Sequence, residues 1–361
     1  ITNTRLFLQL GDSSSESTGS MNFSQIGWLL TQWYQSHSRD LPWRASKDPY
    51  RIWISEVMLQ QTQVDTVIPY YLRFCERFPT IEALARAELE EVLALWKGLG
   101  YYRRAENLHK GVKKIVRELH GRFPTSLKEI AQIPGIGDYT AGAILSIAFN
   151  QPVAAVDGNV MRIMARQFAI DEDIGSTKSK RLFERLVLEH MEGEPSVYNQ
   201  ALMELGALIC TPRSPKCSEC PVQSTCKAYA QGNTEAYPVK ARKEKPVEEV
   251  YTALVLKRGE AYYLEKRPEN GLLANLWGFP LLDESLYERL CALGQPLNPV
   301  RHVFTHKRWR LLPVVVEYTG KNEERLRAIL NIEPVKFFAM DDIQRLPIGT
   351  AFLKIISQID R

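Results

Sequence analysis

The chain has 361 residues, of which 24% are charged and 45% hydrophobic, and its formal net charge is +4 at pH 7. This length can bury a sizeable core and form two or three domains. The charge excess is small, so a surface for a polyanion must come from local clustering of Lys and Arg. No stretch approaches the length of a membrane-spanning helix, which excludes an integral α-helical membrane protein.

The first twenty residues combine a short apolar stretch, 6–10, with a polar run, 12–17, and precede Met21. The apolar stretch is too short for the hydrophobic region of a signal peptide. We therefore expect residues 1–20 to be a disordered leader outside the fold.

From Asn22 to about Ala230, apolar residues recur at helical spacing, as in Ile54, Val57 and Met58, and short Pro/Gly segments separate the runs. No segment in this region has the alternation of a strand. The pattern predicts an all-α domain over residues 21–230.

Residues 133–140 read Ile-Pro-Gly-Ile-Gly-Asp-Tyr-Thr and precede an apolar helical run, 141–149. Gly135 and Gly137 provide positions for positive φ and remove side chains from the backbone. The N–H groups at the start of the next helix can then approach a phosphate. This pattern is typical of a helix-hairpin-helix that binds the DNA backbone, although an ordinary corner between two helices fits it equally well.

Four of the six cysteines fall in one short stretch with the spacing Cys-x6-Cys-x2-Cys-x5-Cys: Cys210, Cys217, Cys220 and Cys226. A disulfide framework is typical of short secreted chains and does not suit this one. Structural zinc and an iron–sulfur cluster both use four thiolates, so the spacing indicates a metal centre without identifying the metal.

Residues 231–248 are polar and rich in Lys, Arg and Pro, which indicates a linker. Beyond it, segments 251–256 and 261–265 have the pattern of a β-hairpin, and segment 311–318 that of a Val-rich strand. Residues 351–359 have a helical pattern. Together, the strand patterns and this helix predict a smaller α/β domain over residues 249–361.

Several longer motifs accompany the hairpin, Asp157 and the cysteines; they occupy residues 40–44, 55–62, 98–102, 198–201 and 204–207. Together these motifs resemble the endonuclease III superfamily of DNA glycosylases, and most closely its MutY-type adenine DNA glycosylases. The resemblance covers most of residues 21–230. It implies a helix-hairpin-helix fold, a 4Fe–4S cluster on the four cysteines and double-stranded DNA as the partner. The sequence gives no oligomerisation signal, so we expect a monomer, and we expect it in the bacterial cytoplasm, associated with the nucleoid.

The C-terminal part resembles the Nudix-like domain that this family carries. Gly278 and Glu284 satisfy the first spacing of the Nudix hydrolase motif, but Ala292 and Leu293 stand where that motif has Arg-Glu. We therefore expect this domain to recognise the lesion and to lack diphosphohydrolase activity.

Cleavage of an N-glycosidic bond needs one acid to protonate the leaving base and one anion to stabilise the sugar cation. The resemblance assigns these roles to Glu56, which protonates N7 of the flipped adenine, and to Asp157, which forms a transient covalent adduct that water resolves with retention. Glu56 lies in an apolar helical segment, where burial would raise its pKa. From the sequence alone, Glu56 also fits a solvated helix residue and Asp157 a helix N-cap.

Bifunctional members of the superfamily carry a nucleophilic Lys in the hairpin, where this chain has Tyr139. We therefore expect a monofunctional enzyme, with the Tyr139 hydroxyl donating to the Asp157 carboxylate. The resemblance further implies that Asn159 positions the attacking water and that Arg44 and Gln200 contact the extruded base.

The family's substrate is adenine opposite 8-oxoguanine or guanine, reached by flipping the base out of the duplex. By resemblance, Gln61 and Tyr101 enter the duplex, with Thr62 and Leu99 on the 8-oxoguanine side. A C-terminal loop that reads the damaged base is matched by Phe304, Thr305 and His306. Alternatively, Tyr101 packs in the core and His306 is an ordinary surface residue.

Two other functions remain compatible with the sequence. One is an endonuclease III-like glycosylase that acts on a pyrimidine lesion or mismatch, against which Tyr139, Gln200 and the C-terminal domain argue. The other is a non-catalytic DNA-binding protein with a cluster, against which the presence of both Glu56 and Asp157 argues.

Overall fold

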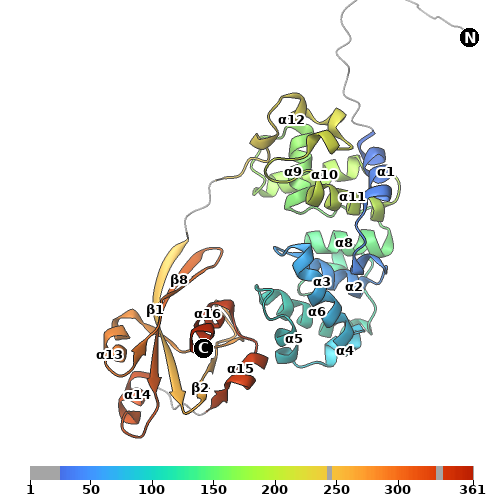
Figure 1. Ribbon diagram of the computed structural model, residues 1–361. Helices are drawn as coiled ribbons and strands as arrows, with labels where there is room; N and C mark the ends of the chain where they lie inside the picture. Colours follow the sequence, from blue (N-terminus) through green and yellow to red (C-terminus); the bar gives the residue numbers. More distant parts are fainter. Residues whose placement is uncertain (1–24, 242–245, 331–335, 361) are drawn as a thin grey trace, which may run out of the picture.

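The computed structural model describes residues 25–241, 246–330 and 336–360, which form a helical part followed by a part built on a β-sheet (Figure 1). The predicted leader, residues 1–20, lies outside the described residues. No helix in the described ranges is long and apolar enough to cross a membrane.

The helical part contains no strand within residues 25–241, as the sequence predicts. Its α-helices are α1 (Ile26–His37), α2 (Pro49–Leu59), α3 (Val64–Arg77), α4 (Ile81–Arg86), α5 (Leu89–Leu95), α6 (Arg103–Leu119), α7 (Leu127–Ile130), α8 (Asp138–Phe149), α9 (Gly158–Phe168), α10 (Thr177–Glu189), α11 (Pro195–Leu208) and α12 (Lys227–Ala230).

Local signals explain where the helices that carry the candidate residues begin. At α2, the Asp48 side chain accepts a hydrogen bond from the Tyr50 N–H, and Pro49 occupies the first helical position. At α9, the side chain of Asp157 caps the helix by accepting from two backbone N–H groups.

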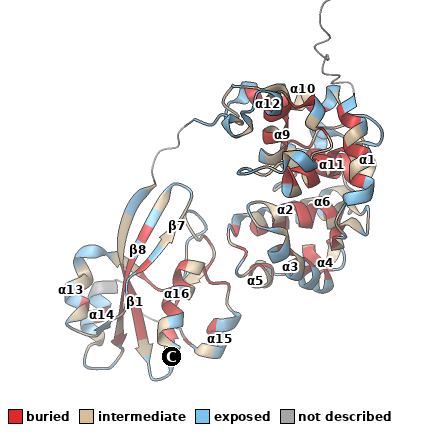
Figure 2. Cartoon of the chain, turned by 45° about the horizontal axis from the view of Figure 1, so that its top comes forward, coloured by how far each residue is buried: buried red, intermediate tan, exposed pale blue. Residues whose placement is uncertain are grey.

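Two hydrophobic cores divide the helical part into two lobes (Figure 2). The first core packs α2 to α8 around fully buried side chains such as Trp53 and Trp96. The second packs α1 against α9, α10 and α11, with Phe183 and Tyr198 at its centre. A cavity between two rigid lobes can therefore take side chains from both.

The C-terminal part is built on a mixed sheet with the order β6-β8-β1-β2-β9, to which β5 adds beside β1 and β7 beside β8. The strands are β1 (Val247–Arg258), β2 (Ala261–Tyr263), β5 (Leu281–Asp283), β6 (Gln295–Pro296), β7 (Val300–Val303), β8 (Lys307–Glu317) and β9 (Phe337–Ala339), with β3 (Glu265–Lys266) and β4 (Trp277–Gly278) as a separate pair. The long strands β1 and β8 run parallel, from Val247 opposite Lys307 to Lys257 opposite Glu317.

Helices cover both faces of this sheet (Figure 1). One face packs against α13 (Tyr287–Cys291) and α14 (Glu323–Leu330), the other against α15 (Met340–Arg345) and α16 (Thr350–Ile359). The predicted hairpin is confirmed by the pairing of β1 with β2, the Val-rich strand by β8, and the last helix by α16.

The chain between the two parts is more closely held than the predicted linker 231–248 suggests. The N–H of Ala241 donates to Asp173 Oδ1 at 3.2 Å, and that of Ile174 to the Val239 carbonyl at 3.1 Å. Because β1 already begins at Val247, only a short stretch is left between the helical part and the sheet, and residues 242–245 of it lie outside the described residues.

The two parts touch through the segment that contains β4. Leu276 is fully buried and belongs to the first helical core. Beside it, Asn275 Nδ2 donates to Glu106 Oε1 at 3.1 Å and Trp277 Nε1 donates to Glu90 Oε1 at 2.6 Å. The C-terminal part is therefore docked on the first lobe.

Candidate active site

A large cavity opens between the two helical lobes, with about 1980 Å³ of space that includes open solvent. Its lining brings together the four predicted catalytic residues: Glu56, Tyr139, Asp157 and Asn159. The first two come from α2 and α8 of the first lobe, whereas the other two lie at the start of α9 in the second. The cavity opens to solvent and is of the size that admits a ligand as large as an extruded nucleotide.

Glu56 is the buried acid of this cavity. Its side chain is enclosed in α2, with the residue only 5% exposed, and accepts a hydrogen bond of 2.5 Å from the Tyr139 hydroxyl at Oε2. Burial raises the pKa of Glu56 to about 7, the negative charge of Asp157 adds to the rise, and the bond from Tyr139 opposes it. The predicted rise in pKa is confirmed, and a carboxyl group with this pKa can hold a proton at neutral pH.

The predicted partner of Tyr139 is wrong. Its hydroxyl donates to Glu56 rather than to Asp157. Burial, together with the nearby carboxyl groups, raises the pKa of Tyr139, so the phenol stays protonated and acts as a donor. Tyr139 therefore orients the acid of the pair instead of its anion.

Asp157 both caps α9 and lines the cavity, so it can be the helix N-cap and the predicted catalytic anion at the same time. Oδ1 accepts the N–H groups of Asn159 at 2.9 Å and Val160 at 2.8 Å, while Oδ2 accepts Asn159 Nδ2 at 2.7 Å. The positive end of the α9 dipole lies at this carboxylate. These three bonds fix the direction in which Asp157 presents its oxygens.

Asn159 is itself held by a residue that the sequence did not single out. The Arg162 guanidinium donates from Nη2 to Asn159 Oδ1 at 3.0 Å and from Nε to the Cys210 carbonyl at 2.7 Å. Hydrogen bonds thus run from the cysteine segment through Arg162 and Asn159 to Asp157. The only signal in the sequence is an arginine on the apolar side of a helix.

A buried carboxylate organises the predicted base contacts. Glu204, with a side chain 1% exposed, accepts from Arg44 Nη2 at 2.8 Å and from Arg39 Nη2 and Nε at 2.9 Å. Burial raises the pKa of Glu204, but these bonds outweigh it and lower the pKa to about 2. Glu204 lies in one of the motifs that carry the resemblance, but the sequence assigned it no role. It follows Gln200 by one turn of α11.

Arg44 and Gln200 both line the cavity, and both are fixed by protein contacts. Arg44 Nη1 also donates to the Arg39 carbonyl at 2.8 Å. Gln200 Oε1 accepts from the Tyr34 hydroxyl at 3.2 Å, and its Nε2 donates to the Ser196 carbonyl at 3.1 Å.

A second cavity of about 1340 Å³, including open solvent, lies between the helical part and the sheet domain. It brings together the predicted recognition residues from both: Gln61, Tyr101, Phe304, Thr305 and His306. The two cavities share Gln60 and Gln61, so they adjoin.

The other two residues predicted for this side lie elsewhere. Thr62 lines the first cavity. Leu99 is only 6% exposed, belongs to the first helical core and lines neither cavity. The turn around it directs the Leu99 side chain inward, and its place on the 8-oxoguanine side stays a prediction.

The two residues predicted to enter DNA share an unusual backbone conformation. Gln61 has φ 59° and Tyr101 has φ 48°, in the left-handed region that residues other than glycine rarely occupy. Tyr101 is 54% exposed, which rules out the core-packing alternative. Such strain concentrates at functional loops.

The predicted hairpin precedes α8. Gly135 has φ 83°, and a Cβ there would come within 3.0 Å of the Asn107 carbonyl carbon. Gly137 caps α8 with φ −91°, so it does not use positive φ as expected, but a Cβ there would meet nothing within 4 Å. The backbone at the start of α8 is therefore unobstructed.

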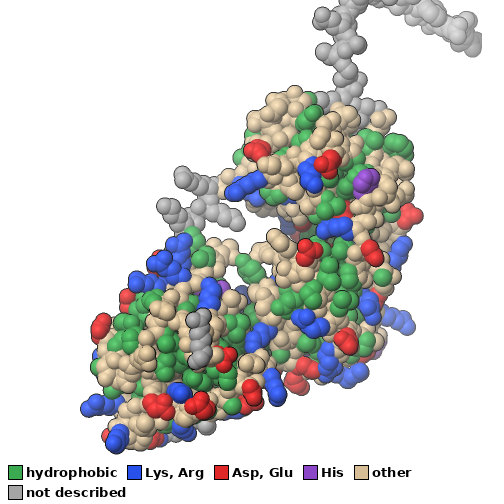
Figure 3. Space-filling model, viewed as in Figure 1, with side chains coloured by type: hydrophobic (Ala, Val, Ile, Leu, Met, Phe, Trp, Pro, Cys, Tyr) green, Lys and Arg blue, Asp and Glu red, His purple; other side chains and the backbone are tan. Residues whose placement is uncertain are grey.

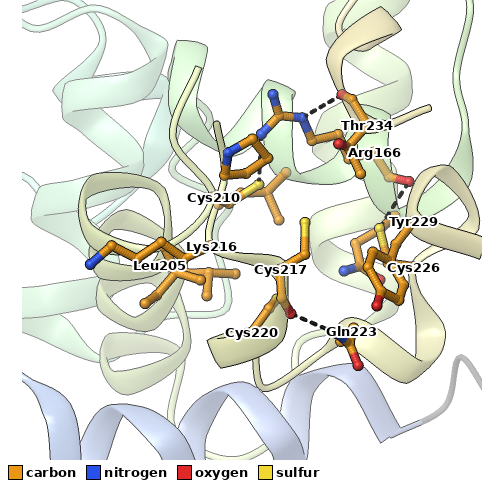
Figure 4. Close-up of a pocket in the computed structure, with 14 residues that line it drawn as sticks. Arg166, Leu205, Cys210, Lys216, Cys217, Cys220, Gln223, Cys226, Tyr229 and Thr234 are labelled. Atoms are coloured by element: carbon orange, nitrogen blue, oxygen red, sulfur yellow. Dashed lines mark hydrogen bonds between the residues drawn. The ribbon is translucent and has the colours of Figure 1, made fainter. Parts of the chain in front are cut away.

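The four clustered cysteines line one space of about 370 Å³, which includes open solvent (Figure 4). Arg166, which is buried, donates from Nη1 to Cys210 Sγ at 3.3 Å. Within the described ranges, no three His, Cys, Asp or Glu side chains are close enough to hold a metal ion. Four thiols around one space can hold either a zinc ion or an iron–sulfur cluster, so this geometry does not name the metal.

Comparisons with known proteins agree with this geometry. A family model described as HhH-GPD superfamily base excision DNA repair protein matches residues 54–189, the iron–sulfur binding domain of endonuclease III matches residues 210–226, and a NUDIX domain matches residues 251–358. An adenine DNA glycosylase of Buchnera aphidicola (Schizaphis graminum) is 38% identical over 81% of this chain and 87% of its own length. The human adenine DNA glycosylase is 34% identical over 90% of this chain and 72% of its own length.

The chain belongs to the adenine DNA glycosylase family.

Membership in the adenine DNA glycosylase family identifies the metal centre that the cysteine spacing left open. The module at Cys210–Cys226 holds an iron–sulfur cluster, for which the four thiols lining one space are suitable ligands. All four candidate ligands come from the protein, which leaves no position at the cluster for a substrate to bind.

Among solved structures, a thermostable thymine-DNA glycosylase is similar with a TM-score of 0.52 and 29% identity, over 58% of this chain and 97% of that one. The similarity covers about the extent of the helical part. The sheet domain thus distinguishes this family member from that smaller enzyme.

Proposed function

We propose that this chain hydrolyses the N-glycosidic bond of adenine opposite 8-oxoguanine or guanine in double-stranded DNA and leaves an abasic site. The observation that carries the proposal is the pair of carboxyl groups in one cavity. Glu56 has a pKa of about 7 and holds a proton, whereas Asp157 is oriented by the end of α9.

In this proposal Glu56 protonates N7 of the extruded adenine, which turns the base into a better leaving group. Asp157 faces the sugar cation that develops as the bond breaks, forms a transient covalent adduct and releases it to water with retention. Asn159, held by Arg162 and bonded to Asp157, is placed to orient that water. Arg44, fixed by Glu204, and Gln200 contact the base edge.

We propose that the enzyme is monofunctional. Strand cleavage through a Schiff base needs an amine nucleophile. Among the described residues that line the catalytic cavity there is no lysine, and the hairpin position carries Tyr139, whose hydroxyl is engaged by Glu56.

The second cavity is the proposed reader of the opposite base. Gln61 and Tyr101 enter the duplex, Thr62 supports them from the catalytic side, and the Phe304-Thr305-His306 loop contacts the damaged guanine through the Thr305 hydroxyl. Backbone amides beside Gly135 and Gly137 bind a phosphate. Exposed basic residues on the strands that flank the loop, Arg301, Arg308 and Arg310, favour contact with phosphates on the other side. Figure 3 shows Lys and Arg side chains on the face of the sheet domain that is turned to the viewer.

The resemblance also supports a 4Fe–4S composition for the cluster. We further propose a monomer that acts in the cytoplasm on nucleoid DNA. Iron and sulfide analysis tests the composition, since zinc in stoichiometric amount would contradict it. Light scattering after gel filtration tests the monomer.

The function is tested by single-turnover base release from four duplexes: adenine opposite 8-oxoguanine, guanine or thymine, and thymine glycol opposite adenine. Each reaction is read with and without alkali, which converts an abasic site into a nick. We expect adenine loss from the first two duplexes and nicks only after alkali. Nicks without alkali, or release of the pyrimidine lesion, would instead support the endonuclease III-like alternative.

A further inference from the structure

Two short loops carry the residues that the proposed function places inside the duplex. One follows α2 and contains Gln61; the other spans 96–102 and contains Tyr101. The second loop has positive φ at Gly98 (100°), Gly100 (73°) and Tyr101 (48°), and of these three only Tyr101 is strained, because glycine adopts such angles freely. A non-glycine residue in the left-handed region costs about 1–3 kcal/mol and persists only where its surroundings hold it.

One side chain holds both loops. The Arg104 guanidinium, at the start of α6, donates from Nη1 to the carbonyls of Val57 at 2.6 Å, Met58 at 3.1 Å and Gln60 at 2.5 Å. These carbonyls belong to the end of α2, where helical hydrogen bonds run out and negative partial charge collects.

The other arm of the same guanidinium points to the second loop. Nη2 donates to the carbonyls of Leu99 at 3.4 Å and Gly100 at 3.3 Å. The guanidinium also lies over the rings of Trp96, at 5.5 Å, and Tyr101, at 5.8 Å. Burial lowers the pKa of Arg104 to about 10, which leaves it a cation at neutral pH.

We propose that Arg104 is a positioning residue that fixes the distance between Gln61 and Tyr101, and so sets the gap into which the duplex must fit. This inference rests on the proposed function, because it assumes that both residues enter DNA. A planar fork can bind two sets of carbonyls at once, whereas a lysine ammonium is a single point charge. With the fork removed, each loop relaxes separately and the extruded adenine is no longer supported from both sides.

The test compares Arg104→Met and Arg104→Lys with wild type and with Arg117→Met, a control on the same helix whose side chain is 78% exposed and lines neither cavity. Single-turnover release is measured on adenine opposite 8-oxoguanine, and 2-aminopurine fluorescence beside the target reports unstacking. Thermal unfolding and the visible absorption of the cluster report folding.

We expect Arg104→Met to lower the release rate by roughly 10- to 100-fold, the size expected for a misplaced reacting group, and to reduce the fluorescence change. Arg104→Lys should show an intermediate loss. The loss should shrink on a duplex whose target adenine lies opposite an abasic site, because an unpaired base costs less to extrude.

Each outcome decides between distinct statements. Failure of wild type to release adenine would contradict the proposed function itself. Normal release and fluorescence in a folded Arg104→Met would overturn the positioning role alone, as would an equal loss on the unpaired target, which would indicate general damage. If Arg104→Met does not fold, Arg104→Lys decides by the same criteria.

Discussion

The cavity between the helical lobes and the cleft between the two domains solve different physical problems. In the first, the groups proposed for chemistry lie on helices or at their ends, are buried or half-buried, and are each held by a specific partner, as Glu56 is by Tyr139. In the second, the groups lie on loops, and Gln61 and Tyr101 adopt strained conformations. Proton transfer needs a fixed environment that sets a pKa, whereas reading a duplex needs exposed side chains whose backbone is held from behind.

The sharpest way to test the catalytic side of this comparison is Glu56→Gln. The amide can still accept from Tyr139 but carries no acidic proton, so we expect base release to fall by roughly 10²–10⁴-fold on every adenine substrate. Single-turnover kinetics measure the loss, and equilibrium binding of the duplex should be preserved. A rate within a few-fold of wild type would remove Glu56 as the acid.

Removing the charge of Glu204, which binds Arg39 and Arg44, should have an effect almost as large, but on the free energy of unfolding. Glu204→Gln leaves Arg39 and Arg44 with a neutral partner in a buried site, and breaking a buried pair costs about 3–5 kcal/mol. Denaturant unfolding measures the change. The matched control is Glu189→Gln, which breaks an exposed pair with Arg185 worth about 0–1 kcal/mol; equal losses in both would contradict a special role for Glu204.

The pKa of Glu56 predicts a pH dependence that the interdomain cleft should not share. The acid form is required, so release should be constant below about pH 7 and fall roughly tenfold per unit above it. Because the bond from Tyr139 lowers this pKa, Tyr139→Phe should move the falling limb to higher pH. A limb that stays in place would show that Tyr139 does not set the acidity of Glu56.

The raised pKa of Glu56 also makes the stability of the folded protein depend on pH. The pKa of Glu56 is higher in the folded protein than its ordinary value of 4.5, so the stabilisation it provides is complete below about pH 4.5 and is lost as the pH rises to about 7. Glu56→Gln should therefore unfold at a higher temperature than wild type at pH 8, with a smaller difference at pH 5. Thermal unfolding at the two pH values checks this.

On the recognition side, smaller and selective effects are expected. Thr305→Ala removes one hydroxyl from the cleft and should cost about 0.5–1.5 kcal/mol, a roughly two- to twelve-fold loss on adenine opposite 8-oxoguanine with little change opposite guanine. Thr305→Ser keeps the hydroxyl and serves as the control. An equal loss on both duplexes in Thr305→Ala would assign the loop to general DNA binding.

The smallest effect should come from the contact between the domains. Lys97 Nζ donates to the Gln344 carbonyl at 2.7 Å, at the end of α15, and the Tyr102 hydroxyl donates to the Ile348 carbonyl at 3.1 Å. Lys97→Met should therefore reduce the preference for 8-oxoguanine by only a few-fold, since Tyr102 still braces the loop. The double variant Lys97→Met/Tyr102→Phe should lose more of the preference for 8-oxoguanine than the two single variants together. If the free-energy losses of the single variants simply add up, Lys97 and Tyr102 do not brace the loop jointly.

The sequence predicted the elements well because their signals are local. Apolar spacing indicated the helices, and alternation indicated the pairing of β1 with β2 and the strand β8. The meeting of Glu56 with Asp157 carried no local signal, and only the family resemblance brought them together.

The features that the sequence could not predict have the same origin. Tyr139 bonds to a residue 83 positions away, so its partner could not be read from neighbouring residues. Leu99 lies between Gly98 and Gly100, both with positive φ, and their backbone conformation rather than the residue type turns it inward. Glu204 shows in the sequence only as a charge among apolar neighbours, and Arg104 only as the second of two adjacent arginines.

The most direct test of the division between chemistry and recognition is the ratio of single-turnover rates on adenine opposite 8-oxoguanine and opposite guanine. It is measured at one pH for wild type, Tyr139→Phe and Thr305→Ala. We expect Tyr139→Phe to change both rates by the same factor and leave the ratio unchanged, and Thr305→Ala to lower the ratio through the 8-oxoguanine duplex alone. A changed ratio in Tyr139→Phe, or an unchanged one in Thr305→Ala, would contradict the separation of the two cavities.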